Sequence, residues 1–277
     1  MTLESTQQMP EPPAIPPLSA MPCYTPKIVT GDCLEVMRGM PDESVDVVFT
    51  DPPFNVGKKY GGDHDDRKDN YREWCAEWIA ECFRLLKPTG TIYLMTIARH
   101  LEWKMPLMAK HGVFVSLIPW KNVSASHDKR RYWNAYQPII CYGKTDAYKF
   151  NTYAQTRELP KPSWQEARAE RQKGQLLDYW DDIPLVYAGS VVHPEAVLQP
   201  GTCKKAHPCQ MPTGIVTRAL MFSSDVGDTV LDPFNGSGTS AVAAKQLNRR
   251  YIGIEQNPEY VQITNERLNQ DALALGV

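Results

Sequence analysis

The apolar residues of this chain form short runs that alternate with longer segments of helical spacing. β-Branched and aromatic runs predict strands at residues 27–31, 45–50, 91–96, 113–120, 136–142, 227–231 and 250–254. Apolar residues three and four positions apart predict helices at 33–39, 71–86, 98–111 and 239–247. This alternation predicts an α/β fold with a doubly wound, mostly parallel, Rossmann-like sheet of seven strands, covered by helices on both faces.

The alternation is interrupted in two places. Residues 1–26 hold seven prolines and little periodicity, so we expect a disordered or extended N-terminal arm. Residues 144–200 are rich in proline, aromatic and basic residues, with one candidate helix at 164–171. We therefore predict one α/β domain in two halves, 27–143 and 201–277, with an insertion at 144–200 between them.

The segment Asp51-Pro52-Pro53-Phe54 directly follows the predicted strand 45–50. The two prolines have no N–H group to donate, so they end the strand and leave Asp51 at its carboxyl end. Open α/β sheets bind their ligands at that end. A carboxylate, a carbonyl and an aromatic ring on a stiff backbone can accept hydrogen bonds from an amino group and stack on a flat ring.

A second candidate site lies far downstream. Strand 227–231 leads into the glycine-rich segment Asp232-Pro233-Phe234-Asn235-Gly236-Ser237-Gly238-Thr239-Ser240 and then into a helix. The glycines let the backbone approach a ligand, and the amino end of the helix favours a carboxylate. The next strand ends in Glu255, where an acidic residue typically accepts from ribose hydroxyls. The segment has neither dinucleotide-fingerprint spacing nor the lysine of a phosphate loop, so a zwitterionic nucleoside fits it better.

Together these segments resemble the amino-group DNA methyltransferases, which methylate N6 of adenine or N4 of cytosine with S-adenosylmethionine. Asp51-Pro52-Pro53-Phe54 matches the catalytic motif of that family, and the glycine-rich segment matches its cofactor motif. His207-Pro208-Cys209-Gln210-Met211-Pro212 is similar to the family's His-Pro-Thr-Gln-Lys-Pro segment, with Cys209 and Met211 as departures. Gly31-Asp32-Cys33 resembles the strand turn that contacts the cofactor's adenine. The order, with the catalytic motif first and the cofactor motif last, marks the β-class.

The resemblance implies a methyltransferase sheet with one antiparallel hairpin, and a target-recognition role for residues 144–200. It implies that Asp51 and the Pro52 carbonyl accept the amino hydrogens of a flipped-out base, on which Phe54 stacks. The full implied catalytic set is Asp51, Pro52, Pro53 and Phe54. The implied S-adenosylmethionine contacts are Gly31, Asp32, Cys33, Asp51, His207, Gln210, Asp232, Phe234, Asn235, Gly236, Ser237, Gly238, Thr239, Ser240 and Glu255.

The target base expected from the resemblance is adenine in double-stranded DNA. Cytosine-specific members of the family usually carry serine where this chain has Asp51. Methylation of cytosine N4 is the alternative. An RNA or protein-amide methyltransferase shares related chemistry, and a non-catalytic DNA-binding protein is a further hypothesis. The basic insertion, the permuted motif order and the intact Asp51, Asp232 and Glu255 favour a DNA-modifying enzyme.

Basic residues near the proposed site are candidate DNA contacts. Lys58 and Lys59 follow the catalytic motif, and Lys129, Arg130 and Arg131 precede aromatic residues, which suits phosphate contact and stacking. The net charge of the whole chain is -2, which is unusual for a DNA-binding protein. However, residues 121–175 hold eleven Lys or Arg and five Asp or Glu, so this region is basic.

The cysteines offer two further interpretations, both of which we reject. Pro208-Cys209 matches the nucleophile of cytosine-C5 methyltransferases, but that class carries its cofactor motif at the amino end. Cys203, His207 and Cys209 lack the spacing of a zinc finger or ribbon, so we expect no metal.

Composition also bears on location and partners. Seven cysteines without framework spacing predict a reducing cytoplasm, and the lack of an apolar run of about 20 residues predicts no membrane span. The resemblance implies double-stranded DNA as the substrate. It also implies two partners that family members often have, a second copy of the chain and a cognate restriction endonuclease.

Overall fold

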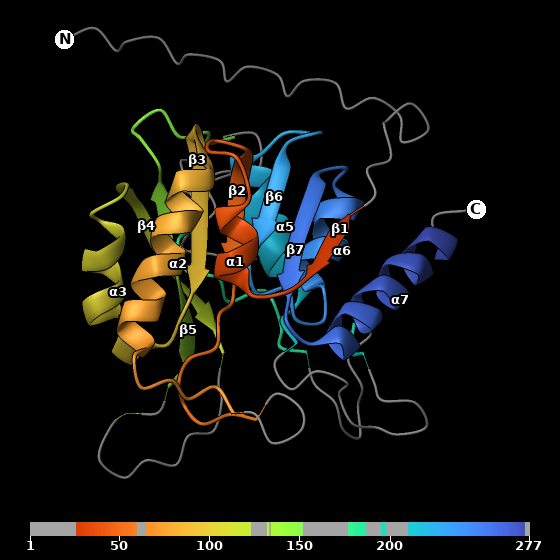
Figure 1. The fold of residues 1–277 in the computed structure, drawn as a ribbon, viewed down its shortest axis with the longest axis horizontal. Coiled ribbons are helices and arrows are strands. Elements are labelled where there is room, and N and C mark those ends of the chain that lie inside the picture. The colour runs from red at the N-terminus through yellow and green to blue at the C-terminus, as the bar shows by residue number, and fades with distance from the viewer. Residues whose placement is uncertain are drawn as a thin grey trace, which may run out of the picture.

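The computed structural model describes residues 26–59, 65–122, 132, 134–151, 177–186, 195–197 and 210–274. Within these residues, seven strands form one sheet in the order β1-β7-β6-β2-β3-β5-β4 (Figure 1). β5 runs antiparallel to its neighbours β3 and β4, and all the other neighbouring strands are parallel. The predicted doubly wound sheet and its antiparallel hairpin are confirmed.

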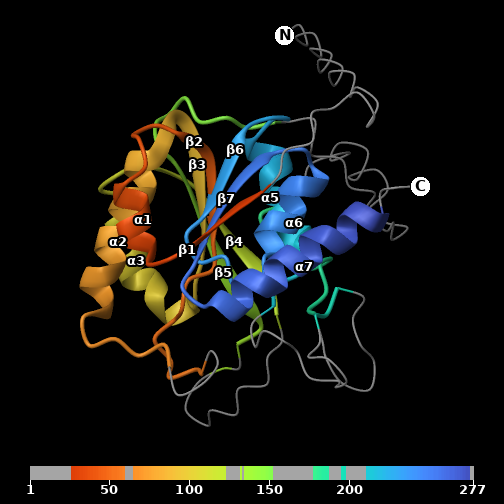
Figure 2. The same cartoon turned by 45° about the vertical axis from the view of Figure 1, so that its right-hand side comes forward.

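The strands are β1 (Lys27–Thr30), β2 (Val45–Thr50), β3 (Leu86–Met95), β4 (Val113–Lys121), β5 (Tyr136–Gly143), β6 (Thr229–Asp232) and β7 (Arg250–Glu255). The helices are α1 (Cys33–Arg38), α2 (Tyr71–Leu85), the 3-10 helix η2 (Ala98–His100), α3 (Leu101–Met108), α5 (Thr213–Ser223), α6 (Thr239–Gln246) and α7 (Pro258–Ala274). Helices α1, α2 and α3 cover one face of the sheet, and α5, α6 and α7 cover the other (Figure 2). Each face has its own apolar core, with Trp78 and Met37 in the first and Ile215 and Ala243 in the second.

The strand predicted at 91–96 begins five residues earlier than expected, directly after the helix predicted at 71–86. Leu86 already has extended backbone, with φ -65° and ψ 137°, and it begins β3. Pro88 and Gly90, which lie between the two predicted elements in the sequence, are therefore inside the strand. Pro88 is tolerated because it lies near the strand's start, where pairing with β2 is interrupted between Leu86 and Thr91.

The predicted helix 98–111 is also shorter than expected. It is divided into η2 and α3, and α3 ends at Met108. The Ala109 N–H still donates to the Met105 carbonyl at 3.0 Å, but the Lys110 and His111 N–H groups donate only three residues back, at 3.2 Å and 3.0 Å. The α-helix therefore ends in a tighter turn of the 3-10 type.

Two helices were not predicted. In α5, Ile215, Val216, Ala219 and Leu220 are fully buried and carry a plain helical spacing. In α7, the Asn257 side chain accepts from the Glu259 N–H at 2.9 Å, as a helix cap does. Both signals were present in the sequence, because Pro212 and Pro258 each lie at a helix start.

The pairing of β2 with β6 joins the two halves of the domain. Val47 pairs with Val230 and Val48 pairs with Leu231 in parallel register. From this pair, β3 lies on one side and β7 and β1 lie on the other, so the chain order reverses here. Such a switch point in an open α/β sheet forms a crevice at the carboxyl ends of the strands. The crevice lies between residues that are about 180 positions apart in sequence.

Parts of the predicted insertion belong to the packed core. The Trp180 N–H donates to the Pro119 carbonyl at 3.0 Å, and the Trp180 carbonyl accepts from the Lys121 N–H at 2.8 Å. Trp180 and Ile183 are buried beside the α5 face. The candidate helix 164–171 and most of the arm 1–26 lie outside the described residues. No helix in the described part of the chain is long and apolar enough to span a membrane.

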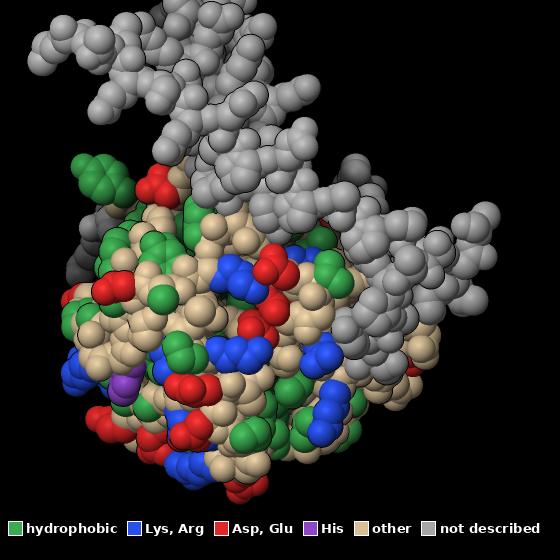
Figure 3. Space-filling model, turned by 90° about the horizontal axis from the view of Figure 1, so that it is seen from above, with side chains coloured by type: hydrophobic (Ala, Val, Ile, Leu, Met, Phe, Trp, Pro, Cys, Tyr) green, Lys and Arg blue, Asp and Glu red, His purple; other side chains and the backbone are tan. Residues whose placement is uncertain are grey.

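Ion pairs gather at the amino ends of the parallel strands, where acidic and basic side chains are interleaved (Figure 3). Asp46 in β2 is the most central of these groups. It accepts from Lys87 Nζ, at the start of β3, at 2.8 Å and 2.9 Å. It also accepts from the Thr229 N–H, at the start of β6, at 2.9 Å. The buried Asp46 carboxylate therefore ties β2 to both neighbouring strands.

We expect Asp46→Ala to lower the free energy of unfolding by about 1–3 kcal/mol, because it leaves the Thr229 N–H and Lys87 without their acceptor. Urea unfolding measures this change. Glu102→Ala, which removes an exposed carboxylate paired with Arg72 at 3.5 Å, is the control and should change stability little. Equal stability of the Asp46→Ala and Glu102→Ala variants would contradict the role given to Asp46.

Candidate active site

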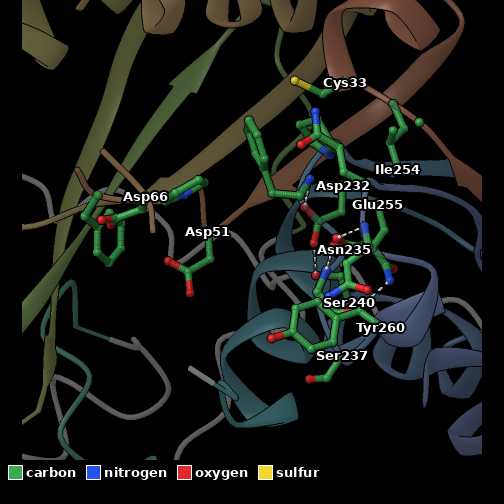
Figure 4. A pocket seen from close by; sticks show the side chains of 18 of the residues that line it. Cys33, Asp51, Asp66, Asp232, Asn235, Ser237, Ser240, Ile254, Glu255 and Tyr260 are labelled. Atoms are coloured by element: carbon green, nitrogen blue, oxygen red, sulfur yellow. Dashed lines mark hydrogen bonds between the residues drawn. The ribbon is translucent and has the colours of Figure 1, made fainter. Parts of the chain in front are cut away.

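A cavity of about 730 Å³ opens at the carboxyl ends of β1, β7, β6 and β2. Figure 4 shows Asp51 between Asp66 on one side and Asp232, Asn235 and Glu255 on the other. The structure thus brings the two candidate sites into one cavity. Of the predicted site residues, those lining it are Gly31, Cys33, Asp51, Pro53, Phe54, Asp232, Phe234, Asn235, Gly236, Ser237, Thr239, Ser240 and Glu255.

Asp51 follows the last residue of β2 and faces the cavity. Its Oδ1 atom is buried and has no hydrogen-bond partner within the described chain. Burial and then the negative charge of Asp232 raise the pKa of Asp51 to about 7, although Lys104 and Lys58 oppose the shift. An unpaired carboxyl group with a near-neutral pKa is a common feature of functional sites.

The rest of the Asp-Pro-Pro-Phe segment is rigid. Pro52 is buried, and no described donor is bonded to its carbonyl. The Pro53 carbonyl accepts from the Tyr71 hydroxyl at 2.7 Å, which ties the segment to α2. The Phe54 side chain belongs to the cavity wall. Pro53 lines the cavity whereas Pro52 does not, so the role predicted for the Pro52 carbonyl stays a prediction.

The loop after Phe54 is organised by Asp66, a residue that sequence reasoning missed. Its buried carboxylate accepts from the Val56, Gly57 and Lys58 N–H groups at 3.1 Å, 2.6 Å and 2.8 Å. Asp66 belongs to a run of acidic residues, and nothing in the sequence distinguishes it from Asp65. Lys58 and Lys59 do not line the cavity, but they pair with Asp66 and Asp65, which do.

Asp232 lies at the end of β6 and is buried in the wall of the cavity. Its Oδ1 accepts from the Phe234 N–H at 3.0 Å, and its Oδ2 accepts from the Ser240 hydroxyl at 2.7 Å. Burial raises its pKa to about 7 despite these bonds, and Glu255 adds to the shift. Neither Asp51 nor Asp232 forms an ion pair with a Lys or Arg of the described chain.

The glycine-rich loop is held by bonds inside the protein. Asn235 Nδ2 donates to the Thr264 hydroxyl at 2.9 Å, and Asn235 Oδ1 accepts from the Tyr251 hydroxyl at 2.8 Å. Gly238 has φ +79°, and a Cβ there would lie 2.4 Å from Thr264 Cγ2. Gly238 is therefore required for the packing of α7 against the loop, and it does not line the cavity. The side chain of Asn235 likewise serves to shape the loop.

Glu255 at the end of β7 belongs to the same wall of the cavity as the glycine-rich loop. Its Oε2 accepts from the Gly236 N–H at 2.8 Å, and its Oε1 accepts from the Asn257 N–H at 2.9 Å. Burial raises its pKa. Each carboxylate oxygen keeps a further lone pair, so Glu255 can still accept from a hydroxyl in the cavity.

Two predicted residues at the start of α1 have different environments. Asp32 caps α1 by accepting from the Leu34 N–H at 2.9 Å, and it also accepts from Gln256 Nε2 at 2.7 Å. It lies behind the cavity wall. Cys33 lines the cavity, and burial raises the pKa of its thiol to about 12, so the thiol is neutral near pH 7.

The remaining predicted residues cannot be assigned to the cavity. Gln210 bonds to the Glu195 carbonyl and, at 2.8 Å, to the Val197 N–H, and it does not line the cavity. His207, Cys209, Lys129, Arg130 and Arg131 lie outside the described residues. Their roles stay predictions. Lining residues that the sequence analysis missed are Asp65, Asp66, Arg67, Lys68, Trp74, Ile254, Gln256, Asn257, Pro258, Glu259 and Tyr260.

Comparison with known proteins identifies the family. Residues 45–266 match the sequence model of the DNA methylases that act on N6 or N4 amino groups. The chain is 34% identical over 251 residues to the DNA adenine methyltransferase YhdJ of Escherichia coli (strain K12), covering 87% of this chain and 82% of YhdJ.

Two solved structures have the same fold. The cytosine-N4-specific PvuII DNA methyltransferase is 20% identical with a TM-score of 0.64, and the match covers 89% of this chain and 88% of that one. The complex of M1.HpyAVI with S-adenosylmethionine is 23% identical with a TM-score of 0.57, and the match covers 88% and 100% of the two chains.

The chain therefore belongs to the N6/N4 DNA methylase family. Enzymes of this family take the methyl group from S-adenosylmethionine, and the protein is a DNA methyltransferase that uses this donor. The family expected from the four sequence motifs is confirmed, as is its cofactor.

The raised pKa of Asp51 predicts a pH-dependent stability. Its pKa is about 7 in the fold and 3.8 in ordinary surroundings, so between these values the folded state binds more protons than the unfolded state. The contribution of Asp51 to the free energy of unfolding therefore falls as the pH rises from about 4 to about 7. Asp51→Asn cannot ionise and removes this contribution.

The quantity to compare is the free energy of unfolding of Asp51→Asn minus that of the wild type. We expect this difference to be larger at about pH 8 than at about pH 5, by on the order of 2–4 kcal/mol. Urea unfolding of both proteins without ligand gives this difference. If the Asn variant and the wild type differed by the same amount at both pH values, the Asp51 carboxyl would not be held at a raised pKa.

Proposed function

We propose that this enzyme methylates N6 of adenine in double-stranded DNA, with Asp51 and the Pro52 carbonyl accepting hydrogen bonds from the amino group. The observation that supports the proposal most is the position of Asp51. Its Oδ1 is buried and without a partner among the described residues, and it shares one cavity with the glycine-rich loop and Glu255.

The residues of the cavity fit S-adenosylmethionine. Its volume of about 730 Å³ lies within the range of pockets that enclose ligands of this size. Asp51 and Asp232 are buried carboxyls without a cationic partner among the described side chains, so a ligand with positive charge would favour their ionised forms. On this proposal Glu255 accepts from the ribose hydroxyls, and the start of α6 faces the carboxylate.

The reaction needs little from the protein beyond position and charge. Bound S-adenosylmethionine supplies a methyl group already activated by a positively charged sulfur. Asp51 and the Pro52 carbonyl orient the amino nitrogen and draw its hydrogens away from the ring plane. As that nitrogen becomes positive, the Asp51 carboxylate stabilises it, and its near-neutral pKa allows it to take the proton that the nitrogen releases.

Two observations favour adenine over cytosine. The chain carries Asp51 where cytosine-N4 members of the family usually carry serine. The relative with 34% identity is named as a DNA adenine methyltransferase. The family as a whole includes both specificities, so this choice depends on the base found in the product.

On this proposal, basic residues beside the cavity contact the DNA. Arg67 and Lys68 line the cavity, and the Arg67 side chain is 72% exposed. Lys58 and Lys59 come from the same loop, which Asp66 holds in place. Such side chains contact phosphates and position the duplex without reading its sequence. Sequence recognition by residues 144–200, a second copy of the chain, a cognate endonuclease and a cytoplasmic location stay predictions.

We expect Asp51→Ala to lower single-turnover methyl transfer to DNA by about 100-fold or more, because the carboxylate acts on a charge that develops only during the reaction. S-adenosylmethionine affinity should fall less, since Asp232 and Glu255 are retained. Asp51→Asn keeps one carbonyl oxygen as an acceptor and should lose less activity than Asp51→Ala.

Circular dichroism and cofactor titration establish that both variants fold and bind. Glu102→Ala, an exposed carboxylate on α3, is the control for loss of a negative charge. A folded Asp51→Ala enzyme with near-normal turnover would remove Asp51 from the mechanism, and Cys209 would then have to be tested as a nucleophile.

A further inference from the structure

Lys104 on α3 has an unusual position for a lysine. Its side chain is fully buried, and its Nζ atom has no hydrogen-bond partner within the described chain. Lysines are almost never fully buried without a partner, because removing an ammonium group from water costs several kcal/mol. A cost of this kind is retained where the group has a function.

Aromatic rings surround the ammonium group. Lys104 Nζ lies 5.9 Å from the ring centroid of Tyr71, 6.0 Å from that of Trp78 and 5.5 Å from that of Trp103. We call these three rings the aromatic cage. Cation–π attraction to such rings offsets part of the cost of burial. Burial still lowers the pKa of Lys104 to about 8, so the group carries its positive charge near neutral pH.

The aromatic cage is joined to the catalytic segment. The Tyr71 hydroxyl donates to the Pro53 carbonyl at 2.7 Å, two residues beyond Asp51. Lys104 is the first of the positive charges that lower the pKa of Asp51. The pKa of Lys104, which burial lowers, is raised first by Cys75 and then by Asp51. Lys104 and Asp51 make no direct ion pair. They are a buried cation and a buried anion that influence each other across the wall of the cavity.

Asp51 is the one acidic group named beside Lys104 that ionises near neutral pH. On α2, burial raises the pKa values of Tyr71 and Cys75, so both stay neutral. In η2, burial lowers the pKa of His100 to about 4, with Lys104, Arg99 and Arg72 adding to the shift, so its ring is uncharged. On the other side, Asp51 is faced by Asp232, which opposes its ionisation, and by Lys58.

We propose that Lys104 is a positioning residue for methyl transfer, whose buried ammonium group is the fixed counter-charge that favours the ionised form of Asp51 before the cofactor binds. This inference rests on the proposed role of Asp51. Without Lys104, a carboxyl buried beside Asp232 would take up a proton at a higher pH and could no longer accept both amino hydrogens. A buried site for the cation has one advantage over an exposed one, since water and salt do not screen it.

The test is the pH profile of the Lys104→Met variant. Methionine is unbranched, of similar length and uncharged, so it can fill the aromatic cage. We expect the acidic limb of kcat/KM for S-adenosylmethionine, which reports on the enzyme before that ligand binds, to move upward by about one pH unit. At alkaline pH, where Asp51 ionises without help, activity should return to within a few fold of the wild type.

A merely structural role for Lys104 gives a different result. It would lower the melting temperature and reduce activity by the same factor at every pH, with the acidic limb unmoved, and this outcome would overturn the proposal. On our account the melting temperature of Lys104→Met is unchanged or higher, because the variant buries no charge. Lys110→Met, which removes an exposed lysine just beyond α3, is the control and should leave the profile in place.

If Lys104→Met does not fold, a second measurement tests the proposed interaction between Lys104 and Asp51. The pKa of Lys104 can be followed by NMR of 13Cε-labelled lysine in the wild type and in Asp51→Asn. We expect this pKa to fall in Asp51→Asn, because the facing anion is gone, and an unchanged value would overturn the proposal. The activity of Asp51→Ala keeps the two claims separate. If Asp51→Ala is inactive but Lys104 and Asp51 do not influence each other's titration, only the inference about Lys104 fails.

Discussion

The parallel pairing of β2 with β6 is the constraint on which the site depends. It places two segments from opposite ends of the domain at one strand switch point, so Asp51 and Asp232 share a single buried cavity. Asp46 reinforces this pairing at the other end of the strands, where it accepts from Thr229 as well as from Lys87. The permuted order of the motifs along the chain makes no difference to this geometry, because the sheet brings together strand ends and not neighbours in sequence.

Charge inside the cavity follows from burial. Asp51 and Asp232 both have pKa values raised to about 7, and neither has a cationic partner in contact among the described side chains. The cavity is therefore suited to a ligand that carries positive charge, as S-adenosylmethionine does. The one fully buried lysine among the described residues, Lys104, lies within the aromatic cage, which the Tyr71 hydroxyl joins to the Pro53 carbonyl. Because the pKa of Asp51 is about 7, its ionisation near neutral pH responds to the charge of whatever occupies the cavity.

The fold and the two main motifs could be predicted because their signals are local. The β-branched run before Asp51 and the glycines before α6 determine strand and turn by backbone chemistry alone. The site residues that were missed act through contacts distant in sequence. Asp66 binds three N–H groups of a loop eight to ten residues earlier, and Lys104 is significant only because α3 packs beside Tyr71. The helices α5 and α7 are a different case, because their apolar spacing and starting prolines were readable and were overlooked.

The central claim is that this site transfers a methyl group to the amino nitrogen of adenine. Its most direct test is to incubate the purified protein with double-stranded DNA and S-adenosylmethionine labelled in the methyl group, digest the DNA to nucleosides and identify the labelled product by mass spectrometry. The account predicts N6-methyladenine. Label found in N4-methylcytosine would keep the site and contradict the choice of base, whereas label in 5-methylcytosine would contradict the mechanism itself.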